Sequence, residues 1–302
     1  MIVLTIGAMK NIKKIKEYID LEFQKITPKI LIPTCTISKR GNISFLYYKI
    51  NDDILAKNYN FFFSDAFKLY ASSALANLIL EITRFDIIRD ILQNKFSKYS
   101  SSEHNKLVNT IREFFYSKIN DNNKSYLNYS YRKEILDSLM DFFEESNEFL
   151  LEGFIQFRLK EYKKHLEEVV LYIVKEYETQ KEYKEFINLL KYFVDEQEVK
   201  EEIIHIIGTK DGNFKIYNKD KKDITEKCKE EFIQDFNIKD INYDDLLVST
   251  LITTTPKQIV IHNYNLIKNK ALIETISNIF QDRVKLCSEC EFCLYFNSII
   301  DK

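Results

Sequence analysis

The sequence predicts an α+β protein in which helices predominate, with a small N-terminal αβ unit, a helical middle and a C-terminal αβ module containing a βαβ unit. The main observation is that the spacing of apolar residues changes near residue 60 and again near residue 198. Between these borders apolar residues repeat every three or four positions, as in amphipathic helices, while short apolar runs typical of strands lie outside them. Hydrophobic residues make up 45% of the 302-residue chain and charged residues 30%, as in folded globular proteins. We therefore expect three parts, at 1–60, 61–198 and 199–302.

The N-terminal part combines strands with one helix. Residues 2–7 form an apolar run that predicts a short buried strand. The lysine-rich segment that follows predicts an amphipathic helix, because its apolar residues fall on one face: Ile12, Ile15, Tyr18, Ile19 and Phe23. Residues 34–38 and 42–50, separated by Arg40-Gly41, predict a β-hairpin.

The middle part predicts several helices. One begins near Ser64 or Asp65 and continues through Ile82, and another runs through Leu107, Ile111 and Phe115. The polar stretch at 120–124 predicts a loop and the best internal break. A regular stripe predicts a long helix over 146–177, and a second stripe over 183–194 predicts a helix that pairs with it in antiparallel fashion.

The C-terminal part predicts two kinds of strand pairing. Residues 203–207 and 214–217 flank Asp211-Gly212, a strong signal for a hairpin turn. Helices are expected near 225–235 and 243–253. A strand at 258–262, a helix at 268–281 and a strand at 284–287 then predict a parallel βαβ unit.

The cellular compartment predicted by the sequence is the cytoplasm. The apolar run at the N-terminus is much shorter than the central region of a signal peptide. No stretch approaches the roughly 18 uncharged apolar residues of a membrane span. Five cysteines, an odd number, do not resemble the disulfide framework of a secreted protein.

Several enzyme and cofactor classes lack their motifs. The five glycines supply neither a Walker phosphate loop nor a dinucleotide fingerprint, and the four histidines do not form an HExxH helix. No catalytic motif is found, which favours a role other than catalysis. A net charge of -2 disfavours a polyanion-binding surface over the whole chain, while basic runs at 10–16 and 160–165 leave nucleic-acid binding as an alternative.

The cysteines near the C-terminus form the one conspicuous group of chemically active residues. Cys287, Cys290 and Cys293 are spaced three residues apart, which suits a turn around a soft metal, because thiolates bind zinc and iron–sulfur clusters. Small half-buried thiols without a metal are the more common arrangement. Asn297 stands where an iron–sulfur run would have its fourth cysteine. The metal site is therefore the alternative hypothesis, as a zinc- or iron–sulfur-dependent sensor or enzyme.

A fourth ligand is available from the predicted βαβ unit. His262 ends its first strand and Cys287 ends its second. Because the carboxyl ends of neighbouring parallel strands meet at one edge of a sheet, His262 and Asn263 are expected beside the three thiols. Three thiolates and one imidazole form a ligand set suited to zinc, with Asn263 as a polar neighbour.

The region from residue 152 onward resembles the YtxC-like family of putative sporulation proteins of spore-forming bacteria. The resemblance rests on the order of several segments, at 152–159, 182–194, 256–263 and 274–280, followed by Arg283-Val284. It implies a role in sporulation and supplies no activity or catalytic residue. Together with the missing cofactor motifs, it favours a cytoplasmic interaction or regulatory factor that acts through protein partners.

Overall fold

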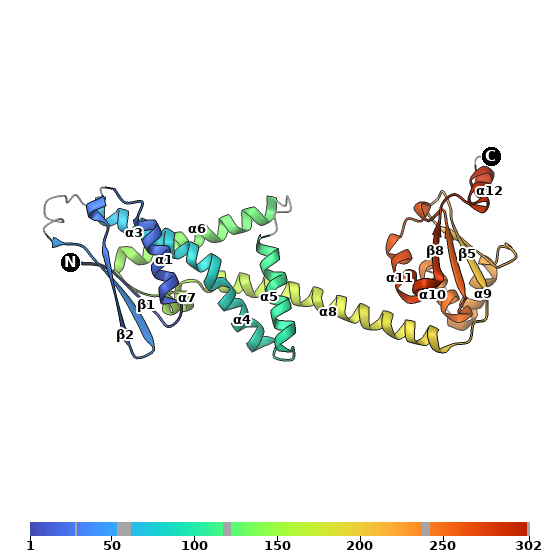
Figure 1. Cartoon of the computed structure of the whole chain (residues 1–302), viewed down its shortest axis with the longest axis horizontal. Helices are drawn as coiled ribbons and strands as arrows, with labels where there is room; N and C mark the ends of the chain where they lie inside the picture. The colour runs from blue at the N-terminus through green and yellow to red at the C-terminus, as the bar shows by residue number, and fades with distance from the viewer. Residues whose placement is uncertain (28, 53–61, 117–121, 237–241, 301–302) are drawn as a thin grey trace. The chain divides into compact units, whose positions relative to one another are not determined.

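The computed structural model describes residues 1–27, 29–52, 62–116, 122–236 and 242–300 (Figure 1). It is 64% helical with two small mixed sheets, which confirms the predicted α+β fold in which helices predominate. The chain divides into two compact units, Met1–Tyr177 and Glu178–Lys302. The expected division into parts at 1–60, 61–198 and 199–302 remains a prediction about which parts fold independently.

The first unit is built on a four-stranded sheet in the order β2-β3-β1-β4. β1 (Ile2–Ala8) is antiparallel to β3 (Ile43–Lys49) and parallel to β4 (Glu148–Leu150). β2 (Thr34–Arg40) pairs with β3 in the predicted hairpin. Gly41 turns this hairpin with φ +59°, a left-handed backbone conformation that glycine adopts without steric strain.

The helices of the first unit share one hydrophobic core with this sheet. The predicted helix near the N-terminus is α1 (Ile12–Phe23), which buries Ile15, Ile19 and Phe23 and packs against α3 (Phe62–Leu78). A single turn, η1 (Lys29–Leu31), precedes the hairpin. The described helices and one π-helical segment, η2, are α1 (Ile12–Phe23), α3 (Phe62–Leu78), η2 (Ile79–Thr83), α4 (Arg84–Lys95), α5 (Ser101–Tyr116), α6 (Asn122–Glu145), α7 (Leu151–Arg158) and α8 (Lys160–Glu196). The residues of α8 after Tyr177 belong to the second unit.

The prediction of one long helix over 146–177 is wrong at its N-terminal end. Residues 148–150 form the strand β4, in which Phe149 is 2% exposed and pairs with Ile6 of β1. The helical ladder also breaks at Leu159, whose ψ of 40° separates α7 from α8. A strand of three residues has no recognisable period of its own, so its pairing with a distant partner decides its structure.

The expected antiparallel helix pair is also wrong, because α8 continues without interruption to Glu196. Residues 178–182 contain neither glycine nor proline, so nothing in the local sequence stops the helix there. The polar stretch at 120–124 is only partly described. Residues 122–124 begin α6 instead of forming a loop, and residues 120–121 lie outside the described residues.

The second unit contains a four-stranded sheet in the order β6-β5-β7-β8. β5 (Ile203–Gly208) and β6 (Phe214–Tyr217) form the predicted hairpin. β7 (Gln258–His262) is parallel to both β5 and β8 (Val284–Cys287). Because α11 (Lys270–Phe280) connects β7 to β8, the predicted βαβ unit is confirmed.

Helices cover both faces of this sheet. Alternate residues of β5 point to opposite faces, so Ile204 and Ile206 enter the main core with α9 (Thr225–Phe236), α10 (Tyr243–Thr254) and α11. Ile207 faces the other way, where it forms a small separate core with Tyr217 and with Phe292 of α12 (Glu291–Ile300). The described part of α12 therefore packs against the sheet through a small apolar cluster.

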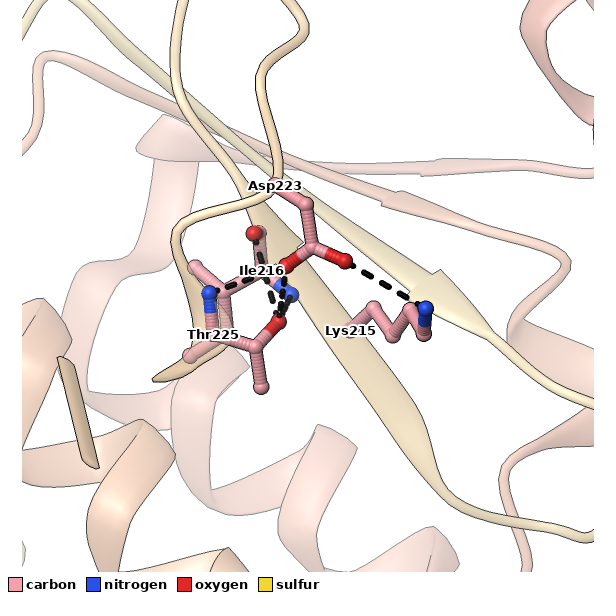
Figure 2. A network of polar contacts seen from close by, with 4 residues as sticks. All are labelled: Lys215, Ile216, Asp223 and Thr225. Carbon is pink, nitrogen blue, oxygen red and sulfur yellow. Dashed lines mark hydrogen bonds and ion pairs between the residues drawn. The ribbon is translucent and has the colours of Figure 1, made fainter. Parts of the chain in front are cut away.

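A polar network joins the start of α9 to β6 (Figure 2). The Thr225 hydroxyl accepts the Ile216 backbone N–H at 2.9 Å and donates to Asp223 Oδ1 at 2.6 Å. Asp223 also accepts the Thr225 backbone N–H at 3.0 Å and pairs with Lys215 Nζ at 3.3 Å. These bonds fix the loop between β6 and α9 at its helical end.

Candidate metal centre

The elements of the second unit bring four metal-ligating side chains to one edge of the sheet. His262 and Cys287 end the parallel strands β7 and β8 and lie directly opposite each other in the register. Cys290 immediately precedes α12, where its carbonyl accepts the first helical hydrogen bond, from Leu294. Cys293 lies in the first turn of that helix. The βαβ unit and the helix start thus converge at the edge that the sequence predicts.

The donor atoms of these four residues all lie within 4.8 Å of one another. His262 Nδ1 is 3.3 Å from Cys290 Sγ and 3.4 Å from Cys293 Sγ. Cys293 Sγ is 3.6 Å from Cys290 Sγ and 3.8 Å from Cys287 Sγ. The four residues can therefore hold a metal ion at a common centre.

The segment that follows His262 is positioned by a close contact between the backbones of Asn263 and Gly208. Asn263 has φ +47°, so the chain turns sharply as it leaves β7. Its carbonyl oxygen would lie 2.5 Å from a Cβ added at Gly208, which ends β5, so only glycine fits there without a shift. The Asn263 backbone N–H donates to the Cys293 thiol. Asn263 is therefore a polar neighbour of the group through its backbone.

Burial keeps the histidines of the site in the neutral form that binds metals. His262 is 4% exposed, and burial, with smaller effects from His205 and Lys221, lowers its pKa to about 4. Burial and Lys221 also lower the pKa of His205. The ammonium of Lys221 lies 4.9 Å from the centre of the Phe292 ring, which packs edge-on against both imidazoles.

The thiols differ in how readily they lose a proton. Burial raises the pKa of the Cys290 thiol, but hydrogen bonds from the backbone N–H groups of Cys293 and Phe292 and from the Cys287 thiol outweigh burial, so the pKa is lowered. Burial raises the pKa of Cys293 to about 11. Cys290, at the helix start, therefore becomes a thiolate more easily than Cys293.

His205 of β5 also lies beside the group. Its Nδ1 lies 3.0 Å from Nε2 of His262, the ring nitrogen that faces away from the thiols. The parallel pairing of β5 with β7 creates this contact between two histidines that are 57 positions apart in the chain. A histidine among isoleucines in a strand is the only local signal for it. Cys35 on β2 and Cys228 in α9 do not belong to this group.

Comparison with known proteins identifies a family for most of the chain. The sequence profile of the YtxC-like family matches residues 69–285. The chain belongs to the YtxC-like family. The uncharacterized protein YtxC of Bacillus subtilis (strain 168) is 24% identical over 214 residues, which cover 70% of this chain and 74% of that protein. No solved structure matches the chain.

The boundary of the YtxC-like match falls inside the candidate centre. His262 lies within the matched residues, and Cys287, Cys290 and Cys293 follow them. The thiols are thus assigned by their spacing in the sequence and by geometry, and not by membership of the family. Among the described helices of this YtxC-like protein, none combines the length and apolarity needed to cross a membrane.

Proposed function

We propose that this protein is a cytoplasmic interaction or regulatory factor of sporulation whose C-terminal unit is organised by one zinc ion. His262, Cys287, Cys290 and Cys293 are the proposed ligands. The observation that carries the proposal is the convergence of their four donor atoms within 4.8 Å.

The spacing of the donors supports a single tetrahedral ion. Zinc–sulfur bonds of about 2.3 Å and zinc–nitrogen bonds of about 2.0 Å separate tetrahedral ligands by about 3.8 Å between sulfurs and about 3.5 Å between sulfur and nitrogen. The Sγ atom of Cys293 lies 3.6 Å from Sγ of Cys290 and 3.8 Å from Sγ of Cys287. It lies 3.4 Å from Nδ1 of His262. An iron–sulfur cluster needs a wider set of ligands, because several metal and sulfide atoms stand between them.

The ligand set supports a structural role for the ion. Four protein ligands fill a tetrahedral zinc site, whereas a catalytic zinc keeps one position open for water or substrate. A closed site cross-links β7, β8 and α12 without providing a place for chemistry. This favours an interaction or regulatory factor over an enzyme.

The process and compartment are proposed on separate grounds. The resemblance of the C-terminal segments to putative sporulation proteins supports sporulation, and membership of the YtxC-like family is consistent with that resemblance. Thiolate ligands need reducing conditions, which the cytoplasm provides.

The zinc content of the full chain tests the metal proposal. Protein purified under reducing conditions without chelator is expected to contain about one zinc per chain. Cobalt substitution should give the visible absorption of a tetrahedral thiolate site. Cys293→Ser should lose most of the bound metal, because it removes the ligand that contacts the other three.

Matched cysteine variants serve as controls. Cys35→Ser and Cys228→Ser should keep the metal, since both residues lie outside the group. Wild-type protein that retains no zinc after reloading and passage over a weak chelator would contradict the zinc centre. Equal zinc content in Cys293→Ser and wild type would also contradict it.

The role in sporulation is tested in cells. A strain that lacks the gene is expected to form fewer heat-resistant spores, and the wild-type gene should restore them. Isolation of partners from sporulating cells with the tagged protein tests the interaction role. Wild-type spore yields in the deletion strain would count against sporulation and would leave the zinc measurement unaffected.

A further inference from the structure

The first unit contains a fully buried cation that the metal centre does not use. Arg84 is the first residue of α4, directly after the π-helical segment η2, and is 1% exposed. Burying a charge is strongly unfavourable unless hydrogen bonds and an opposite charge compensate it. The contacts of this side chain therefore show how much of its charge the protein itself satisfies.

Neutral groups meet only part of the hydrogen-bonding capacity of Arg84. Its Nε donates to the Tyr162 hydroxyl at 3.0 Å, and its Nη1 donates to Asn128 Oδ1 at 3.0 Å. The guanidinium carbon lies 4.2 Å from the centre of the Phe115 ring. Within the described residues, Nη2 is buried without a hydrogen-bond partner and no carboxylate forms an ion pair with Arg84.

A cavity of about 320 Å³ adjoins this side chain, a size within the range of small-molecule sites. Its described lining includes two arginines, two asparagines and two tyrosines: Arg84, Arg132, Asn77, Asn128, Tyr116 and Tyr129. Arg132 also bonds only neutral acceptors within the described residues, Asn77 Oδ1 at 3.3 Å and Ser73 Oγ at 3.2 Å.

The charge of the described lining is positive. Glu81 of η2 is its one acidic residue, and this exposed carboxylate accepts a hydrogen bond from the Tyr18 hydroxyl. The described lining thus contains two positively charged guanidinium groups and one carboxylate, and this carboxylate already accepts a hydrogen bond from Tyr18. A π-helical segment interrupts the regular helix at this point, and such segments are frequent at functional sites.

We infer that this cavity binds an oxyanion, a phosphate or carboxylate group carried by a small molecule. An oxyanion supplies both the negative charge and the acceptors that Arg84 Nη2 lacks, and the planar guanidinium matches such groups in a bidentate manner. Because Arg84 is 1% exposed and its Nη2 is buried, the anion must enter the cavity and displace lining side chains slightly to reach this nitrogen. A terminal group of a small molecule can do so, whereas the backbone of a nucleic-acid duplex cannot.

Calorimetric titration of the full chain tests this inference. The probes are inorganic phosphate and acetate, each compared with chloride at equal ionic strength. At least one probe should bind at millimolar concentration and raise the melting temperature by mass action. Arg84→Met and Arg132→Gln should each weaken that binding by about tenfold or more, because each removes a charged hydrogen-bond donor.

Arg112→Met is the matched control, since Arg112 is exposed in the same unit over the ring of Phe85, and its binding should equal that of wild type. Binding of phosphate alone or of acetate alone would support the site and name the group. No binding of either probe, or equal binding by wild type and Arg132→Gln, would overturn the inference. The Arg132 variant decides the matter even where Arg84→Met fails to fold.

Discussion

At the residue scale, the contact between His205 and His262 orients the proposed imidazole ligand. When His262 Nδ1 faces the thiols and binds a metal, its Nε2 carries the proton and donates it to His205 Nδ1 at 3.0 Å. Such partners of a ligating histidine fix its tautomer and ring orientation. His205→Leu is therefore expected to weaken zinc binding by about 10- to 100-fold, measured by competition with a chromophoric chelator.

Two further variants test whether His205 affects zinc affinity by orienting His262 or only by filling space. His205→Asn keeps an acceptor near the position of Nδ1 and should recover part of the zinc affinity. His165→Leu changes a half-buried histidine of the first unit, where the ring packs near Tyr131, and should leave the affinity unchanged. Unchanged zinc affinity in His205→Leu would show that this histidine does not orient the ligand.

At the element scale, Asp223 ties the start of α9 to β6. Burial alone would raise the pKa of this carboxyl, but its hydrogen bonds from Thr225 and the nearby Lys215 outweigh burial and lower the pKa below 3.8. A lowered folded pKa adds stability that is present above the unfolded value and lost as the pH falls through the folded value. Because the side chain of Asp223 is 39% exposed and solvent screens its charge, Asp223→Asn should reduce stability at neutral pH by only about 0.5 kcal/mol, and this difference should disappear at acid pH.

Urea denaturation of both proteins between pH 7 and pH 2 measures this difference. Asp220→Asn is the control, because it removes a carboxylate from the same loop outside the network of Figure 2. A stability difference between wild type and Asp223→Asn that is equal at all pH values would contradict the assigned role of the charge.

At the scale of the whole molecule, the two units have separate hydrophobic cores, and the metal ligands all lie in the second. Within the described residues, the apolar contact of α12 with the sheet is a small cluster of Ile207, Tyr217 and Phe292, with Cys290 and Phe296 packed against it. The proposed zinc ion is therefore expected to contribute much of what holds this helix. Chelation is expected to increase hydrogen exchange in 287–296 and to leave the first unit unchanged. Mass spectrometry of peptides from both units measures this, and equal protection of 287–296 with and without chelator would show that the metal does not hold α12.

The sequence by itself determined the elements whose signal is local. The strand β1, the helix α1, both hairpins and the βαβ unit follow from contiguous patterns and from turns at Gly41 and Gly212. The meeting of His262 with Cys287 could also be predicted, because the ends of neighbouring parallel strands necessarily share an edge. The candidate centre was thus predictable in outline from a single stretch of about 40 residues.

Only the tertiary structure decided the features that join distant segments. β4 becomes a strand through β1, His205 reaches His262 through the pairing of β5 with β7, and Arg84 is buried against α5, α6 and α8. In each case the local sequence is compatible with several local structures. A short apolar run or a single arginine forms no repeating pattern that would indicate which distant segment it contacts. The free energy of the long-range contact selects among them, and it depends on side chains far away in the chain.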